Sequence, residues 1–417
     1  MRWEGYGIEE RYSVLDNDTM NECRDAFLKI EEIRDTNQLK VLNAFREVGV
    51  STHHLLGSYG YGYGDIGRET LDLVFAKAVG AQDALCRTQF MSGTHAITTA
   101  LFGVLRSGMK ILSVTGTPYD TIHTTLGLKG NSLGSLKEYG ISYDQIDLVN
   151  SKPNLALISQ KACNVDVIYI QRSCGYTFRE ALSLGDIKAI SITAKEVNKE
   201  VIVLVDNCYG EFTNTTEPCS HGADLIVGSL IKNPGGGIAE TGGYIAGRKD
   251  LVELSANRLT APGVGREIGS NPLGYRNVYL GLYMAPMITA EALKSAVYAS
   301  SFFSKLGYET LPKQLNEWND IIAVVKMGSL KKLEIVCRAI QSSSPVDSMA
   351  FPVASNMPGY DNKVIMASGA FTTGSSIELS GDAPIKEPYY AFIQGGLNLI
   401  SSRYAFLKAA TLLDKEK

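Results

Sequence analysis

Residues 225–237 read Leu-Ile-Val-Gly-Ser-Leu-Ile-Lys-Asn-Pro-Gly-Gly-Gly, and upstream residues 201–207 read Val-Ile-Val-Leu-Val-Asp-Asn. Each stretch begins as a short apolar run and ends in polar residues, a pattern typical of a strand buried on both faces of a parallel sheet. Similar runs alternate with helical patterns along the chain from about Leu71. The sequence therefore predicts an α/β domain with a largely parallel sheet, whose functional groups lie at the carboxyl ends of the strands.

The order of the expected elements predicts three regions. A helical arm (1–50) containing a helix over about 18–48 that Gly49 ends precedes a large domain (51–299), and a smaller α/β domain (300–417) follows. In the large domain we expect strands at 110–114, 165–170, 201–205, 224–227 and 243–246, and helices at 95–105 and 186–197. In the small domain we expect a helix at 328–341 and short β segments at 364–366 and 376–379.

Composition excludes several classes of protein. The 417 residues are 45% apolar and 20% charged with a net charge of −4, so the chain is expected to fold and to lack a basic surface for nucleic acid. The first residues contain no apolar signal segment, and no run is long enough to span a membrane. The seven cysteines lack the spacing of zinc or redox sites, so we expect no metal and a reducing cytoplasm.

Lys232 is the first candidate catalytic residue. It follows a buried strand, precedes three glycines that could let a planar ligand approach, and lies three residues after the Ser229 hydroxyl. Partial desolvation is expected to lower the pKa of this amine and make it nucleophilic. The alternative is an ordinary lysine that covers the end of a strand.

Asp206 ends the preceding buried strand at the edge of the expected site. A carboxylate there can keep a pyridine nitrogen protonated, as the acid partner of pyridoxal 5′-phosphate (PLP) does. Alone, Asp206 could equally cap a turn or helix. Together with Lys232 it is a more specific sign of a PLP site than either residue alone.

Residues 91–96, Met-Ser-Gly-Thr-His-Ala, enter an expected helix and could bind a phosphate group. The free amides at a helix N-terminus favour an anion, and the hydroxyls of Ser92 and Thr94 could add hydrogen bonds. An ordinary N-cap is the alternative. His95 is expected to pack locally, because no second histidine or cysteine stands at metal-ligand spacing.

Two tyrosine-containing segments are further candidates. Tyr119 follows the expected strand at 110–114, where its ring could stack on a cofactor or lie buried in the core. Residues 57–65 read Gly-Ser-Tyr-Gly-Tyr-Gly-Tyr-Gly-Asp, a loop that could reach closely toward another group or form a flexible aromatic turn.

These motifs together resemble those of the methionine γ-lyase-type proteins called aluminium-resistance proteins, which are similar to cystathionine β-lyases. The resemblance covers nearly the whole chain. It rests on the segments 92–96, 118–121, 205–212 and 228–237, and continues through 258–263, 344–348, 357–360, 374–380 and 394–397.

The resemblance implies a PLP-dependent transferase-like fold of the aspartate aminotransferase type (fold type I). In that fold Lys232 would bind PLP as a Schiff base, Asp206 would pair with the ring nitrogen and Tyr119 would stack on the ring. Ser92, Gly93, Thr94 and Ser229 would hold the phosphate. The resemblance also implies a homodimer or homotetramer in which Tyr61 or Tyr63 reaches the partner's cofactor, although tyrosine at 63 replaces the arginine of the wider family.

The function implied by the resemblance is a PLP-dependent carbon–sulfur lyase. Its small amino-acid substrate would be cystathionine-like or methionine-like, cleaved by β- or γ-elimination with Tyr119 as an acid to the leaving sulfur. One alternative is a PLP-binding stress or metal-resistance protein with little turnover. A nucleotide-binding protein is disfavoured, because the 57–64 glycines lack a strand–loop–helix context. Candidates for binding the substrate carboxylate are Arg258, Arg266, Arg276 and Arg403.

Overall fold

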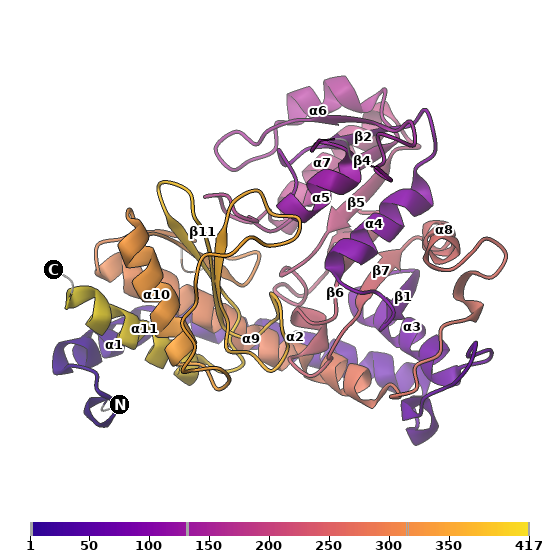
Figure 1. Ribbon diagram of the computed structural model, residues 1–417. Helices are drawn as coiled ribbons and strands as arrows, with labels where there is room; N and C mark the ends of the chain where they lie inside the picture. Colours follow the sequence, from indigo (N-terminus) through magenta and orange to yellow (C-terminus); the bar gives the residue numbers. More distant parts are fainter. Residues whose placement is uncertain (1–2, 131–132, 314, 316, 416–417) are drawn as a thin grey trace.

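A mostly parallel sheet forms the centre of the large domain in the computed structural model, which describes residues 3–130, 133–313, 315 and 317–415 (Figure 1). Within these residues the strand order is β1-β7-β6-β5-β4-β2-β3. Strands β2 to β6 run parallel, whereas β7 is antiparallel to both β6 and β1. The strands are β1 (Asp83–Arg87), β2 (Lys110–Ser113), β3 (Ser142–Gln145), β4 (Val167–Gln171), β5 (Ile202–Asp206), β6 (Leu225–Ser229) and β7 (Gly243–Gly247).

The small domain contains a second sheet, antiparallel throughout its described strands, with the order β10-β11-β12-β9-β8. Its strands are β8 (Glu309–Leu311), β9 (Ile322–Lys326), β10 (Val364–Ala367), β11 (Ser380–Pro384) and β12 (Tyr390–Gln394). Together the two sheets confirm the expected fold class, a large mostly parallel domain followed by a smaller α/β domain.

Helices surround both sheets. Gly49 closes the N-terminal arm with φ of 75°, a conformation that glycine adopts without a steric penalty. No helix among the described residues is long and apolar enough to cross a membrane. The helices are α1 (Glu10–Glu22), α2 (Arg24–Val48), α3 (Ile66–Val79), α4 (Gly93–Val104), α5 (Asp120–Leu126), α6 (Leu155–Ala162), α7 (Leu184–Val197), α8 (Lys249–Leu259), α9 (Arg276–Lys305), α10 (Leu330–Ser342) and α11 (Leu399–Asp414).

Helices α2 and α9 run beneath both domains, and both chain ends lie beside the small domain (Figure 1). Trp3, Tyr12 and Phe27 of the N-terminal arm share one apolar core with the small-domain sheet. The expected domain boundary at residue 299 falls inside α9, which continues to Lys305. The arm and the small domain are therefore packed as one unit although they stand at opposite ends of the sequence.

Most of the expected elements are present, with two differences. The expected helix over 18–48 is part of two helices that meet at Cys23. The expected β segment 376–379 is wrong, because pairing with β12 begins only at Ser380. The Ile377 amide instead donates to the Ile231 carbonyl of the large domain at 3.0 Å, and the Glu378 carboxylate accepts two loop amides.

Three adjacent parallel strands bring polar residues to one edge of the large sheet. Gln171 ends β4 and pairs in register with Asp206 at the end of β5, while Ser229 ends the next strand, β6. All three are buried. This edge is the expected position for a site, because carboxyl ends of parallel strands open onto a common crevice.

Candidate active site

A cavity of about 440 Å³ opens at this edge of the sheet, between the large and small domains. We call it the lysine cavity. Large-domain residues that line it include Ser92, Gly93, Thr94, Tyr119, Thr121, Gln171, Tyr176, Asp206, Cys208, Tyr209, Ser229, Lys232 and Glu240; small-domain residues include Tyr360, Ser375, Asp382, Phe392 and Gln394. The structure thus brings seven of the nine predicted site residues to one cavity.

Lys232 projects from the segment after β6, and its Nζ lies 3.5 Å from the centroid of the Tyr209 ring. Burial lowers the pKa of this amine, but the neighbouring Tyr209 and Cys208 outweigh burial, and the pKa is raised. The expected lowering of the Lys232 pKa is therefore wrong for the chain alone, because desolvation is opposed by groups that stabilise the cation.

The sequence suggested that the glycines after Lys232 let a planar ligand approach. The structure gives them a different role. A Cβ atom at Gly235 would lie 1.7 Å from the Leu230 carbonyl oxygen, and one at Gly236 would lie 2.4 Å from the Gly281 carbonyl of α9. At Gly237 it would lie 2.6 Å from Leu397. These residues are glycine because the chain after Lys232 packs closely against other elements, which fixes the position of the lysine.

Asp206 is 6% exposed, and its Oδ1 accepts a hydrogen bond from the Cys208 amide at 3.1 Å. Burial raises the pKa of this carboxyl group, while Cys208 and Lys232 act in the opposite direction. A cationic nitrogen beside the carboxylate would stabilise the ionised form further. The observed environment thus fits an acid that gains a cationic partner.

The hydroxyls expected to hold a phosphate surround the N-terminus of α4. Ser92 caps this helix, its Oγ accepting from the His95 amide at 3.1 Å, and Thr94 Oγ1 lies 2.8 Å from Thr121 Oγ1. His95 has a local role, because its Nδ1 accepts from the Met91 amide. The first amides of a helix have no intrahelical acceptor, so this end of α4 suits an anion.

Gly93 brings that helix end close to β6 and to the segment after Asp206. A Cβ atom at Gly93 would lie 3.3 Å from Ser229 Cβ and 3.5 Å from Cys208 Sγ. A larger residue would therefore narrow the space between the anion-binding amides and the strand ends. This observation fits a phosphate group held between Ser92, Gly93, Thr94 and Ser229.

Tyr119 belongs to a cluster of three tyrosines that the sequence did not connect. Its hydroxyl lies 2.8 Å from the Tyr360 hydroxyl, and its ring centroid lies 5.3 Å from that of Tyr176. Burial raises the pKa of Tyr119, so the hydroxyl keeps its proton at neutral pH. Tyr176 and Tyr360 were missed because no local pattern links residues so far apart; Tyr360 stood only within a motif of the resemblance.

Tyr61 and Tyr63 do not line the lysine cavity of their own chain. Each is 70% exposed, and their ring centroids lie 5.6 Å apart. Arg68 is fully buried and connects this loop to a distant segment. It donates to the Gly62 carbonyl of the loop at 2.8 Å and to the Glu267 carbonyl at 3.2 Å. The loop therefore presents two tyrosines outward from a rigid base, and their role toward a partner subunit stays a prediction.

None of the four arginines considered for the substrate carboxylate lines the described part of the lysine cavity. Each has a partner elsewhere: Arg258 faces the Phe102 ring, Arg266 pairs with Asp83, Arg276 contacts Asn277 and Arg403 pairs with Asp16. None of these four arginines therefore presents its guanidinium to the described lysine cavity of its own chain.

Comparison with known proteins assigns the family. The family model described as methionine gamma-lyase matches residues 12–413. The chain belongs to this family. It is 44% identical over 395 residues, 93% of both chains, to the uncharacterized protein YnbB of Bacillus subtilis (strain 168).

Solved structures agree with this family assignment. A carbon-sulfur lyase involved in aluminum resistance from Clostridium novyi NT is 47% identical, with a TM-score of 0.94 and coverage of 99% of this chain and 98% of that one. The PLP-dependent protein YhfS of Escherichia coli is 18% identical with a TM-score of 0.61, covering 92% and 97%. That second likeness concerns the fold alone, and it supports the expected fold type I.

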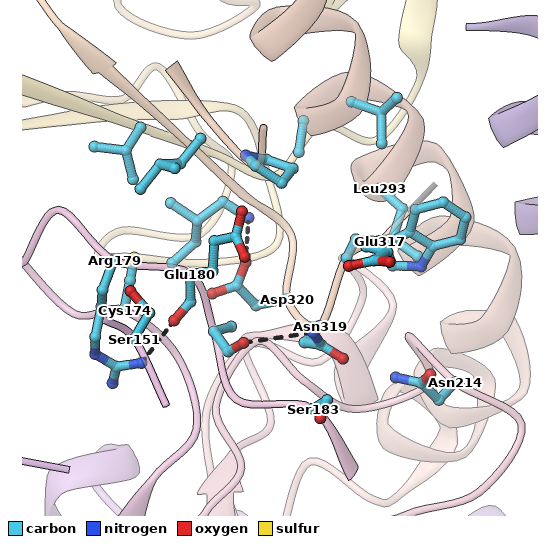
Figure 2. Close-up of a pocket in the computed structure, with 18 of the residues that line it drawn as sticks. Ser151, Cys174, Arg179, Glu180, Ser183, Asn214, Leu293, Glu317, Asn319 and Asp320 are labelled. Atoms are coloured by element: carbon cyan, nitrogen blue, oxygen red, sulfur yellow. Dashed lines mark hydrogen bonds between the residues drawn. The ribbon is translucent and has the colours of Figure 1, made fainter. Parts of the chain in front are cut away.

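A second cavity of about 330 Å³ lies elsewhere in this family member, lined by α2, α9 and the segments around residues 179–183, 311–312 and 317–320 (Figure 2). None of the predicted site residues lines it. Its buried acid is Asp320, whose Oδ1 accepts the Ile322 amide at 3.0 Å and whose Oδ2 has no partner among the described residues. Burial raises the pKa of Asp320 to about 6.

A third group, Asp120, His123 and Asp361, is close enough to hold a metal ion. Its members already have partners within the chain. Asp361 pairs with Lys129 and lies 3.5 Å from His123 Nδ1, while His123 Nε2 lies 2.7 Å from the Pro118 carbonyl. These contacts explain the cluster without a metal.

Proposed function

We propose that this chain is a PLP-dependent carbon–sulfur lyase that acts on a sulfur-containing amino acid of the cystathionine or methionine type. The observation that carries the proposal is that Lys232, Asp206 and the N-terminus of α4 line one cavity at adjacent strand ends. An amine, an acid and an anion-binding helix end are the groups that PLP requires. The name of the Clostridium novyi relative, a carbon-sulfur lyase, supports the same reaction class.

In this proposal, residues of the chain hold the cofactor and move protons. Lys232 would bind PLP through its amine, Asp206 would hold the ring nitrogen, and Ser92, Gly93, Thr94 and Ser229 would bind the phosphate. When bound, PLP supplies an electron sink that stabilises negative charge at the α-carbon of an amino acid. The Lys232 amine would be the base that takes the α-proton.

Tyr119 is the proposed acid at the leaving sulfur. Because burial raises its pKa, it holds a proton that it can donate, and the Tyr360 hydroxyl at 2.8 Å can orient it. The elimination would release a thiol, and water would hydrolyse the remaining fragment to ammonia and a 2-oxo acid. Either β- or γ-elimination is compatible with these groups.

A second candidate function is a PLP-binding protein with little turnover, serving in a stress or metal-resistance response. The observation that favours it is the lack of an arginine in the described lining of the lysine cavity, since amino-acid carboxylates usually pair with one. We also propose a homodimer or homotetramer, because the exposed Tyr61 and Tyr63 extend from a rigid loop.

The test is to purify the protein with PLP, record its absorption spectrum and assay 2-oxo acid and thiol release from cystathionine, cysteine and methionine. A lyase gives a visible cofactor band and equal amounts of both products. A visible band without turnover on any of the three favours the second candidate. The absence of a cofactor band after reconstitution contradicts both.

A further inference from the structure

Asp382 is the buried acid of the small-domain wall of the lysine cavity, and the proposed reaction gives it no role. It lies in β11 and is 1% exposed. Three donors converge on its Oδ2: the Tyr176 hydroxyl at 3.1 Å, the Ser375 hydroxyl at 3.3 Å and the Gln394 Nε2 at 3.1 Å. These bonds fix the carboxyl group from both domains.

The other oxygen, Asp382 Oδ1, is buried and has no hydrogen-bond partner among the described residues. A buried carboxylate oxygen without a partner is unfavourable, and Asp382 lines the lysine cavity, so the free acceptor indicates a donor on the ligand. Burial raises the pKa of Asp382 to about 6, which leaves it mostly ionised at neutral pH. The group facing it is therefore best matched by a cation.

The charges of the cavity wall narrow the class of ligand. No arginine or histidine stands among the described lining residues, and Lys232 is the cation that lines it. Lys232 lies over the Tyr209 ring and is reserved for the cofactor in the proposed reaction. The small-domain wall thus offers an anionic acceptor, the Asp382 carboxylate. An amino-acid carboxylate would instead require a hydrogen-bond donor there.

We propose that Asp382 is the specificity-determining residue of the lysine cavity and binds an ammonium group carried beyond the sulfur atom of the substrate. In the proposed function the substrate's α-amino group would be held at the cofactor beside Lys232, so it would not be available to Asp382. The preferred substrate class is then an S-substituted amino acid with a second, distal ammonium group, as in cystathionine, and not a simple thioether such as methionine. This inference rests on the proposed function.

A matched pair of substrates tests the inference. L-Cystathionine and S-(3-carboxypropyl)-L-cysteine differ only by the distal ammonium group. The wild-type holoenzyme is expected to prefer cystathionine by about tenfold or more in kcat/KM, because an unpaired buried acceptor penalises the analogue that lacks the donor. Asp382→Asn, which removes the charge and keeps the shape, is expected to reduce this preference to about threefold or less.

Asp320→Asn is the matched control, since Asp320 is also a buried acid, in the second cavity, with one oxygen that has no partner among the described residues. It should leave the preference unchanged. Equilibrium binding of the two compounds to a Lys232→Ala background, measured by calorimetry, gives a second readout that needs no turnover. There too cystathionine should bind about tenfold more tightly, and Asp382→Asn should remove the difference.

The possible failures are distinguishable. If neither compound yields a 2-oxo acid but the binding preference depends on Asp382, the proposed lyase function fails and the inference stands. If turnover occurs while wild type shows no preference, or Asp382→Asn retains it, the inference fails and the function stands. Should Asp382→Asn not fold, the wild-type comparison between the two compounds still decides, because it requires no variant.

Discussion

The lysine cavity and the second cavity each contain a buried aspartate, Asp382 and Asp320. Burial raises the pKa of each to about 6, and one oxygen of each has no partner among the described residues. Their surroundings differ. Arg179 lines the second cavity (Figure 2). It donates to the backbone carbonyls of Gln171 at 3.1 Å and Glu180 at 2.9 Å, so its guanidinium holds the backbone in place. In the lysine cavity the amine of Lys232 lies over the Tyr209 ring and donates no hydrogen bond to a backbone carbonyl of the described residues.

The difference shows that a perturbed carboxyl group is not sufficient to identify an active site. The lysine cavity lies where three parallel strands end and where the N-terminus of α4 points, so it combines an acid, an amine and an anion-binding helix end. Among its described lining residues the second cavity has neither a strand-end lysine nor a predicted site residue. The comparison therefore predicts that substitutions in the lysine cavity will alter enzymatic activity and that matched substitutions in the second cavity will not.

The largest expected effect is that of Lys232→Ala. It removes the group proposed to bind PLP and to move the α-proton, so 2-oxo acid formation should fall by about 10³-fold or more. Borohydride reduction followed by peptide mapping should place the pyridoxyl group on Lys232 in the wild type and on no lysine of the variant. Lys152→Ala, at the second cavity, is the control and should retain activity. A pyridoxyl group on another lysine of the wild type would contradict the whole site.

The next effect is that of Asp206→Asn, which keeps the shape of the side chain and removes its charge. Because the charge stabilises a protonated ring nitrogen, kcat should fall by about 100-fold while bound PLP, measured by absorbance, decreases far less. Asp320→Asn, the equivalent change in the second cavity, should leave kcat within about twofold of the wild type. Equal losses in the two variants would remove the distinction between the cavities.

The sequence predicted the large-domain part of the lysine cavity because its signals are local. Apolar runs that end in polar residues mark strand ends, and parallel strand ends share one edge, so Asp206 and Lys232 could be placed together without a structure. The glycines after Lys232 were misinterpreted for the same reason. Nothing within that segment reveals that Gly236 packs on the Gly281 carbonyl of α9.

The small-domain wall could not be predicted, since it depends on contacts between distant parts of the chain. Tyr360 meets Tyr119, and Asp382 meets Tyr176, only after the two domains pack together. The unpaired oxygen of Asp382 is a property of packing and leaves no trace in composition or spacing. The four arginines are likewise absent from the described lining of the cavity because ion pairs, a ring contact and a hydrogen bond hold them elsewhere.

A third prediction extends the comparison to a partner subunit. If Tyr61 or Tyr63 completes the lysine cavity of a neighbour, mixing Lys232→Ala chains with Tyr61→Phe/Tyr63→Phe chains should create one site with all intact groups. Isolated mixed dimers of the two inactive parents should then show about half of wild-type activity, because one of their two sites has every group intact. The measurement is 2-oxo acid release from mixed oligomers separated by a tag on each parent. The shared-site hypothesis is wrong if proven mixed oligomers are no more active than their parents.

The smallest expected effect concerns Glu211, a fully buried acid beneath the lysine cavity. Its Oε1 accepts from the Tyr244 hydroxyl at 2.7 Å, its Oε2 has no partner among the described residues, and burial raises its pKa to about 8. The folded chain therefore keeps a proton that the unfolded chain loses above its ordinary pKa. For such a group stability falls as pH rises between the unfolded and folded pKa values, by up to about 1.4 kcal/mol per pH unit.

Glu211→Gln removes this titration, so its Tm relative to wild type should rise between pH 6 and pH 8, by on the order of a few degrees. Asp320→Asn provides the contrast. Because burial raises the pKa of Asp320 only to about 6, half of its titration is already complete at pH 6, and its Tm difference from wild type should change far less over the same range. Calorimetric scans of the three holoproteins at several pH values measure both trends. A Tm difference for Glu211→Gln that does not change with pH would mean that Glu211 is ionised in the folded protein, and that a cation or a donor near Oε2 compensates its charge.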